Sequence, residues 1–219
     1  MPSFADPAAQ AVLDGLFTRP LQRFTLDNGL TVLHVHDTSA QLVSAQVWVR
    51  TGSIHEGPFT GAGLSHYLEH MLFKGTVNRE GPAISEEVQS AGGNINAYTT
   101  FDRTVYHIDG PSEATPAFLD ILADITFRST LPAEEIRKER DVILREIDMG
   151  LDDPDRQVAR TAFETAFLVH PYRHPVIGHR EIFEALNEPD LRGYYHARYA
   201  PNNAVLVLVG GLPATQARD

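Results

Sequence analysis

Two histidines and a glutamate lie within one short segment, His66-Tyr67-Leu68-Glu69-His70. The apolar residues around them have the spacing of an α-helix, in which each residue is turned by about 100°. His66 and His70 would then lie about 40° apart, with Glu69 about 60° to the other side of His66. Two imidazoles one turn apart can hold a tetrahedral Zn²⁺, and the neighbouring carboxylate can reach a water molecule on it. Alone, the pair is ambiguous, because histidines at this spacing occur more often on an ordinary helix surface.

Two further carboxylates, Glu139 and Glu146, lie on a second predicted helix from about Ala133 to Met149. They are seven residues apart and therefore point within about 20° of each other. Their direction falls between two apolar rows that we expect to face the core, Ile136 with Ile143 and Val142 with Met149. A buried unpaired carboxylate costs on the order of several kcal/mol, so it needs a cation, a metal or strong donors. An arginine would satisfy this need, but the two-histidine face lacks a third ligand, which favours Glu146 as that ligand.

The histidine segment resembles the His-x-x-Glu-His signature of the inverzincins, the metallopeptidase family of pitrilysin, insulin-degrading enzyme and the mitochondrial processing peptidase. Members of that family place a glutamate ligand about 74 to 76 residues beyond the second histidine. Here 75 residues separate His70 from Glu146. The flanks are similar too, namely Met71-Leu72-Phe73-Lys74-Gly75-Thr76 after the histidines and Glu139-Arg140 ahead of Glu146.

The resemblance implies a role for each matching residue. His66, His70 and Glu146 would bind one Zn²⁺ per chain, and Glu69 would take a proton from water and deliver it to the leaving amine. Glu139 would orient a ligand without touching the metal. Asn94 to Thr99 is similar to the family's strand that pairs with the substrate backbone. The implied substrate-binding residues are Asn96, which would bind peptide groups, Ala97, which would keep the cleft clear, and Tyr98, Thr99 and Phe73.

These substrate-binding assignments have ordinary alternatives. The segment from Asn94 to Thr99 equally fits a plain strand of a sheet, and aromatic residues such as Phe73 and Tyr98 are more often part of a core. The remaining histidines are expected to be structural, because His34 and His36 alternate on a strand with no acidic neighbour, and His170 and His174 lie in a loop common in the family.

The elements expected around the site indicate an α+β fold. Asn28-Gly29 predicts a two-residue turn within a hairpin over residues 24–32. Further strands are expected at residues 42–49, 94–99, 104–108 and 204–209, and helices at 62–73, 85–91, 113–127, 133–149, 155–167, 180–186 and 190–199. Strands followed by helices and a returning strand predict a two-layer sandwich, with a mainly antiparallel sheet and helices packed on one face.

Composition narrows the partners. The 219 residues include no cysteine, so a metal must be bound through nitrogen and oxygen. The net charge of −11 argues against nucleic acid and could favour basic peptides, although acidic surfaces more often only confer solubility. The sequence contains no run of about 18 apolar residues, so we expect no membrane-spanning helix. Because no signal peptide is visible at Met1, we expect a cytoplasmic or periplasmic protein.

The resemblance runs from about Leu21 to Leu212 and implies the following organisation. Residues 1–20 form a lead-in segment, 21–212 a zinc-binding peptidase domain, and 213–219 a linker or truncated end. Family members are clamshells built from several such domains, and later domains supply an arginine and a tyrosine to the site. An extended peptide is therefore the expected substrate, and further domains or a homologous subunit would complete the chamber. The alternatives are a non-catalytic subunit, which usually lacks one of the four site residues, and a metal-dependent lyase on a related fold.

Overall fold

The computed structural model describes residues 21–212. Its first two strands, β1 (Gln22–Thr25) and β2 (Thr31–His36), form the predicted hairpin. The turn is longer than predicted: Leu26 N donates to Leu30 O at 2.9 Å and Gly29 N donates to Leu26 O at 2.8 Å, which encloses three residues. Gly29 has φ 88°, and glycine in this left-handed position is what a three-residue hairpin with a bulge requires. The predicted two-residue turn is therefore wrong by one residue.

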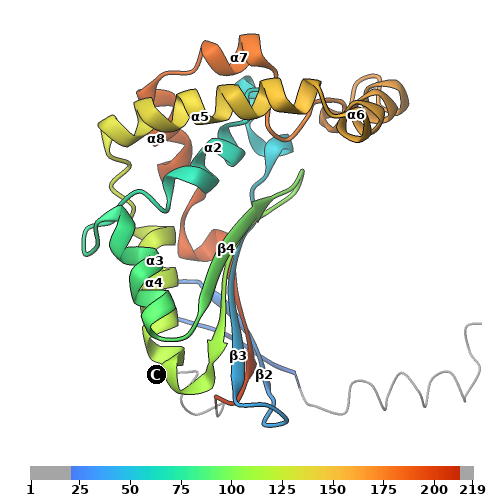
Figure 1. Ribbon diagram of the computed structural model, residues 1–219. Helices are drawn as coiled ribbons and strands as arrows, with labels where there is room; N and C mark the ends of the chain where they lie inside the picture. Colours follow the sequence, from blue (N-terminus) through green and yellow to red (C-terminus); the bar gives the residue numbers. More distant parts are fainter. Residues whose placement is uncertain (1–20, 213–219) are drawn as a thin grey trace, which may run out of the picture.

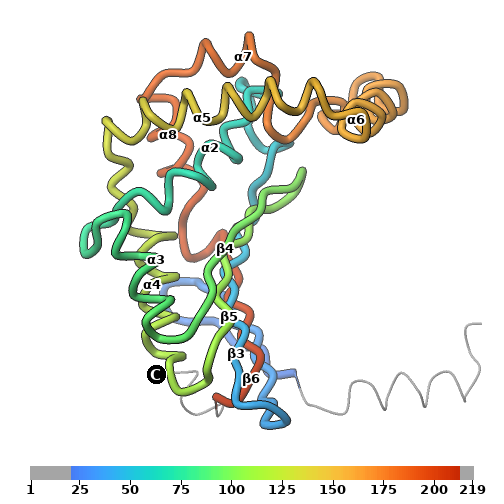
Figure 2. Tube along the Cα trace, in the orientation of Figure 1, coloured from blue at the N-terminus to red at the C-terminus, as the bar shows by residue number. Residues whose placement is uncertain are grey.

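The described strands form one six-stranded sheet in the order β1-β2-β6-β3-β5-β4. β2 and β6 run parallel, whereas every other neighbouring pair is antiparallel, which confirms the mainly antiparallel sheet. The last described strand, β6, lies between β2 and β3, and this position explains its continuous apolar sequence. Figure 2 shows these strands twisting together, with the β4–β5 end extending beyond the others. The remaining strands are β3 (Leu42–Val49), β4 (Asn94–Thr99), β5 (Thr104–Pro111) and β6 (Ala204–Gly210).

All seven predicted helices are present, and they lie on one face and beyond one end of the sheet (Figure 1). α3 begins at Gly81, four residues before the expected start, because Pro82 is tolerated in the first turn of a helix. This arrangement confirms the α+β sandwich. Within residues 21–212 no helix is long and apolar enough to cross a membrane. The helices are α2 (Leu64–Met71), α3 (Gly81–Ser90), α4 (Thr115–Phe127), α5 (Ala133–Leu151), α6 (Pro154–Ala166), α7 (Arg180–Glu184) and α8 (Glu188–Arg198).

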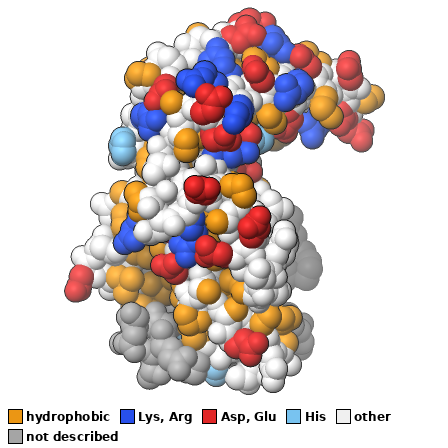
Figure 3. Space-filling model, turned by 60° about the vertical axis from the view of Figure 1, so that its left-hand side comes forward, with side chains coloured by type: hydrophobic (Ala, Val, Ile, Leu, Met, Phe, Trp, Pro, Cys, Tyr) orange, Lys and Arg blue, Asp and Glu red, His pale blue; other side chains and the backbone are white. Residues whose placement is uncertain are grey.

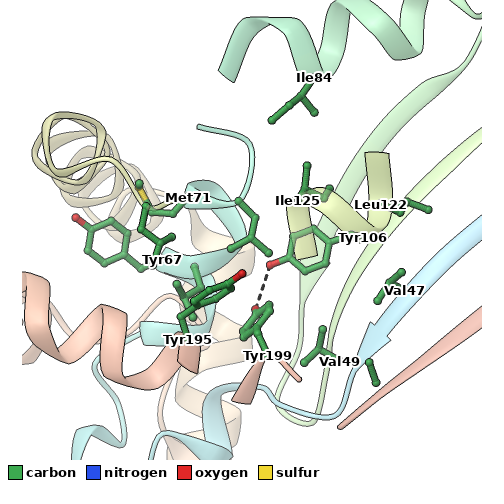
Figure 4. Packing of buried hydrophobic residues seen from close by; sticks show 14 of the residues in the cluster. Val47, Val49, Tyr67, Met71, Ile84, Tyr106, Leu122, Ile125, Tyr195 and Tyr199 are labelled. Carbon is green, nitrogen blue, oxygen red and sulfur yellow. Dashed lines mark hydrogen bonds between the residues drawn. The ribbon is translucent and has the colours of Figure 1, made fainter. Parts of the chain in front are cut away.

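The core lies between the sheet and helices α2, α4 and α8, and it anchors the helix that carries the two histidines. Leu64, Leu68 and Met71 are fully buried on the inner side of α2, as its spacing predicted. Each such side chain contributes roughly 1.5–3 kcal/mol relative to an exposed one. In Figure 4, Met71 and Tyr67 of α2 pack near the aromatic centre of this core, where the hydroxyls of Tyr106 and Tyr199 are 3.1 Å apart.

The apolar seam of α5 differs from the prediction at its end. Ile136 and Ile143 are buried as expected, but Met149 is 71% exposed, and Ile147 is buried in its place. The last turns of α5 continue past α2 toward α6, so that less of the molecule is available to cover them (Figure 1). At the other end of α5, the Tyr67 hydroxyl donates a hydrogen bond to Ile136 O and ties α2 to α5 directly.

A close backbone crossing fixes the start of α2. Gly63 precedes the helix with φ 77°, and a Cβ atom built there would lie 2.1 Å from Ile177 O. The crossing segment needs glycine too, because a Cβ on Gly178 would lie 2.6 Å from the Ala62 carbonyl. Only residues without a side chain allow the two backbones to approach this closely.

Gly63→Ala is expected to lower the free energy of unfolding by about 3 kcal/mol or more, because left-handed strain and a backbone clash add together. Gly57→Ala is the matched control, since Gly57 has φ 60° but no atom within 4 Å of the added Cβ, and it should lose about 1–2 kcal/mol. Urea unfolding of both variants measures the difference. Equal losses would show that the crossing does not hold α2.

Candidate metal centre

Three donor atoms from two helices converge in the structure. His66 Nε2 is 3.7 Å and His70 Nε2 is 3.8 Å from Glu146 Oε2, and all three donors lie within 4.8 Å of one another. These separations are too long for hydrogen bonds. They are close to the separation of about 3.3 Å that two donors have when each lies about 2.0–2.1 Å from one tetrahedral zinc. The structure thus brings together the three residues predicted as ligands, and two imidazoles with one carboxylate suit zinc.

Burial controls the protonation of His66. Desolvation, followed by the nearby charges of His70 and Arg156, lowers the pKa of His66 to about 3. The imidazole is therefore neutral near pH 7, which is the form that binds a metal. Its Nδ1 atom is buried and has no hydrogen-bond partner among the described residues.

His70 is oriented by a carboxylate and a lysine. Its Nδ1 is 3.1 Å from Glu139 Oε2, and Lys74 Nζ is 2.7 Å from Glu139 Oε1. Burial pushes the pKa of Glu139 upward, but hydrogen bonds from Lys74 and His70 outweigh burial and hold that pKa below its ordinary value. The ionised carboxylate accepts a hydrogen bond from the Nδ1–H group of His70, which leaves Nε2 facing Glu146. Glu139 thus has the contact that its predicted orienting role requires.

Glu69 lies where α2 meets β4. Burial raises the pKa of Glu69 above its ordinary value, whereas hydrogen bonds from the Thr99 hydroxyl and backbone and the charge of His70 lower it, and Glu146 raises it. The Glu69 carboxylate therefore lies beside Thr99 and close to His70 and Glu146, two of the candidate ligands. A carboxylate with a raised pKa beside a metal group can both accept and release a proton.

The strand beside Glu69 has a free edge. In the described part of the chain β4 pairs with β5 alone. Thr100 N donates to Arg103 O at 2.8 Å, and hydrogen-bonded pairs recur at every second residue of an antiparallel ladder. The backbone groups of Ile95, Ala97 and Thr99 therefore point outward from the sheet. Ala97 N agrees with this, because it donates to the side chain of Asn96 at 2.8 Å.

The structure separates the remaining predicted substrate residues. Ala97 lies opposite Tyr106 on the face that α2 covers, whereas Tyr98 is on the other face, with its ring 6.4 Å from that of His107. Any pocket that Tyr98 lines is therefore on the face of the sheet away from the three candidate metal ligands. Phe73 packs at the border of the core, 6.1 Å from the Tyr106 ring. Sequence periodicity alone could not tell which face of β4 would meet α2.

One residue that positions the site escaped the sequence analysis. Glu56 is 1% exposed, and its carboxylate accepts hydrogen bonds from Gly63 N at 3.0 Å and Ser65 N at 2.9 Å. Its side chain therefore caps the start of α2, although Glu56 lies eight residues before the helix begins. Burial raises the pKa of Glu56 to about 7, against the opposing effect of these hydrogen bonds. Capping rules consider only residues next to the helix, so the seven residues between Glu56 and α2 hid this contact.

The other histidines have ordinary partners. His34 Nε2 and His36 Nδ1 lie 2.8 and 2.9 Å from Leu212 O. His174 Nδ1 is 2.9 Å from His179 Nε2, and His170 Nδ1 accepts a hydrogen bond from Tyr172 N. These contacts fit the structural roles expected for them.

Comparison with known proteins identifies the class to which this fold and site belong. The model of the insulinase family, Peptidase family M16, matches residues 31–180. The chain therefore belongs to this family, as the His-x-x-Glu-His segment and its spacing to Glu146 predicted.

Relatives and solved structures agree. The chain is 34% identical over 199 residues to an uncharacterized zinc protease of Bacillus subtilis, covering 91% of this chain and 48% of that protein. It is 36% identical to the mitochondrial-processing peptidase subunit beta of Lentinula edodes, covering 86% and 40%. A protease from Helicobacter pylori has a similar structure, with a TM-score of 0.84, 27% identity and coverage of 90% and 48%. The chain thus spans about half the length of these proteins.

Glu56→Gln is expected to change how stability depends on pH. Because the pKa of Glu56 is raised in the folded chain, its contribution to the free energy of unfolding declines as the pH rises from about 4.5 to about 7. In urea unfolding of the metal-free protein, the stability of the parent minus that of the variant should fall by up to about 3 kcal/mol across this window.

Glu134→Gln is the control for this measurement. Glu134 is exposed, and its hydrogen bond with Arg137 lowers its pKa, so any change in that variant has the opposite sign. Parallel pH profiles for the parent and Glu56→Gln would contradict a buried, titrating cap on α2.

Proposed function

We propose that the chain is the zinc-binding domain of an endopeptidase that hydrolyses extended peptides. The observation that carries this proposal is the convergence of His66, His70 and Glu146, with Glu69 beside them. These three residues would hold one zinc ion per chain. When bound, zinc supplies Lewis-acid chemistry for a carbonyl group and for water.

Glu69 is the proposed general base. It would accept a proton from the attacking water and return it to the amine as the peptide bond breaks. Its raised pKa supports the second step, because the protonated form must survive long enough to donate. The hydrogen bonds from Thr99 would hold the carboxylate in place between the substrate strand and the metal group. Glu139 would keep His70 in the tautomer that leaves Nε2 available.

An extended substrate fits the free edge of β4. The outward backbone groups of Ile95, Ala97 and Thr99 would form ladder hydrogen bonds with it, so that recognition depends on an unfolded stretch of chain. The amide of Ala97 is bonded to Asn96 Oδ1, and this side chain would have to move aside when the substrate pairs. Asn96 could then contact a peptide group of the substrate.

Activity of the whole enzyme is proposed to require more than this chain. The chain covers 48% of the Bacillus relative and 40% of the fungal subunit. Further domains or a homologous subunit would supply the other wall of the chamber. A zinc-binding subunit that needs such a partner before it hydrolyses anything is the alternative to an independent enzyme.

Two glutamate substitutions test the assignment together. Glu146→Gln should reduce zinc content sharply, because a neutral amide is a poor zinc ligand. Glu69→Gln should retain about one zinc per chain and lose at least about 100-fold in peptide turnover, because it lacks the base. Metal analysis after dialysis and a fluorogenic peptide assay give the two readouts. Unchanged zinc content in Glu146→Gln, or retained turnover in Glu69→Gln, would overturn the corresponding role.

The isolated 219-residue chain is expected to bind zinc but to hydrolyse peptides slowly. Missing donors for the developing negative charge cost a factor of about 10²–10³ in rate. The measurement compares kcat/KM of this chain with that of a full-length relative on the same unfolded peptide. Comparable values would show that this domain carries a complete active site.

A further inference from the structure

A pocket opens directly beside Glu146. Its volume is about 330 Å³, which is enough for one or two side chains. It lies between the end of α5, helix α6, the tip of the β4–β5 hairpin at Phe101 and the loop of residues 172–178. Figure 1 shows that tip rising toward α6, and Figure 3 shows the molecule hollowed below its projecting helical part.

Three aromatic rings, those of Phe101, Phe163 and Tyr172, line this pocket. The Phe101 ring lies 5.1 Å from that of Phe163 and 4.5 Å from that of Tyr172. Tyr172 also donates a hydrogen bond from its hydroxyl to Asp102 at 3.0 Å, which ties the loop to the hairpin tip. A cavity with rigid aromatic walls is suited to the apolar stem of a bound side chain.

Arginines outnumber carboxylates among the residues that line this pocket. Its lining includes three arginines and one carboxylate, and that carboxylate is Glu146, the proposed metal ligand. Arg160 Nε is 2.8 Å from Glu164, whereas the ion pair of Arg156 with Asp153 is long, at 3.5 Å. Arg173 donates to Leu168 O and forms no ion pair within residues 21–212. The chain as a whole has a net charge of −11, so the charge of this lining is opposite in sign to that of the chain.

We propose that this pocket selects a substrate residue that bears a carboxylate next to the scissile bond. The inference rests on the proposed function and names its substrate class. The apolar part of the residue would lie against Phe163 and Phe101, and its carboxylate would meet the guanidinium of Arg156. A guanidinium offers two parallel donors to a carboxylate.

Arg156 is the residue that decides this selection. Its side chain is 59% exposed, so a carboxylate can reach it, and its charge is close enough to influence His66. It lies in the first turn of α6, where glutamate is favoured, so that a reversal of its charge is compatible with the fold. The overall negative charge would attract basic peptides, but this pocket provides the opposite preference beside the metal.

The test measures binding and does not need turnover. Zinc-loaded Glu69→Gln protein is titrated with fluorescent unfolded peptides of about ten residues, in which Glu, Gln or Lys is placed at each central position in turn. At one position, Glu should bind at least about fivefold more tightly than Gln, and added salt should reduce the difference. Arg156→Gln should abolish the preference, and Arg156→Glu should reverse it in favour of Lys.

Matched controls separate the possible outcomes. Arg137→Glu makes the same charge change on α5 at an exposed residue paired with Glu134, and it should retain the preference for Glu. Peptides with a C-terminal acid or amide show whether the carboxylate comes from a side chain or from the end of the chain. Equal binding of Glu and Gln peptides, an unchanged preference in Arg156→Glu, or no binding of any peptide would overturn the inference. Failure to bind zinc would instead overturn the proposed function.

Discussion

The candidate site depends on how the eight residues of α2 are held. A helix of this length is not stable alone in water, so its position must come from tertiary contacts. Glu56 caps its start, the crossing of Gly63 with the 177–178 backbone fixes its direction, and the Tyr67 hydroxyl bonds to α5. These contacts act at the start and in the middle of α2, so they fix the helix that carries the two imidazoles.

Charged groups around α2 are compensated locally. Glu139 is almost fully buried, yet it has both Lys74 and His70 as partners, so its charge is not isolated. Glu69 and Glu56 have no cation within ion-pair distance in the described part of the chain and accept hydrogen bonds instead, and the pKa of each is raised. The same burial that keeps His66 neutral also raises the pKa of Glu69. The proposed metal binding and the proposed proton transfer would therefore both depend on one desolvated region.

Much of this structure could be predicted from the sequence, because the signals were local or periodic. The seven helices, the strands and the inward direction of Leu64 and Met71 followed from spacing. The convergence of the three candidate ligands followed from a motif with a defined distance to Glu146. Features set by long-range packing were missed. Met149 is exposed because the end of α5 extends beyond the elements that pack against it. The cap by Glu56 depends on a loop that folds back onto the start of α2. No periodic pattern contains that information.

The candidate metal ligands and the pocket beside Glu146 lie on elements of different burial. The ligands lie on α2 and α5, which have side chains in the core, whereas α6, which lines the pocket, has no buried residue. α6 is held by its contacts with α5 and with the turn at Pro171–Arg173. A substitution at an exposed position of α6 is therefore expected to change the charge of the pocket without disturbing α2 or the candidate ligands. The proposed side-chain selection could then change independently of the proposed hydrolytic chemistry, because the residues for the two lie on elements of different burial.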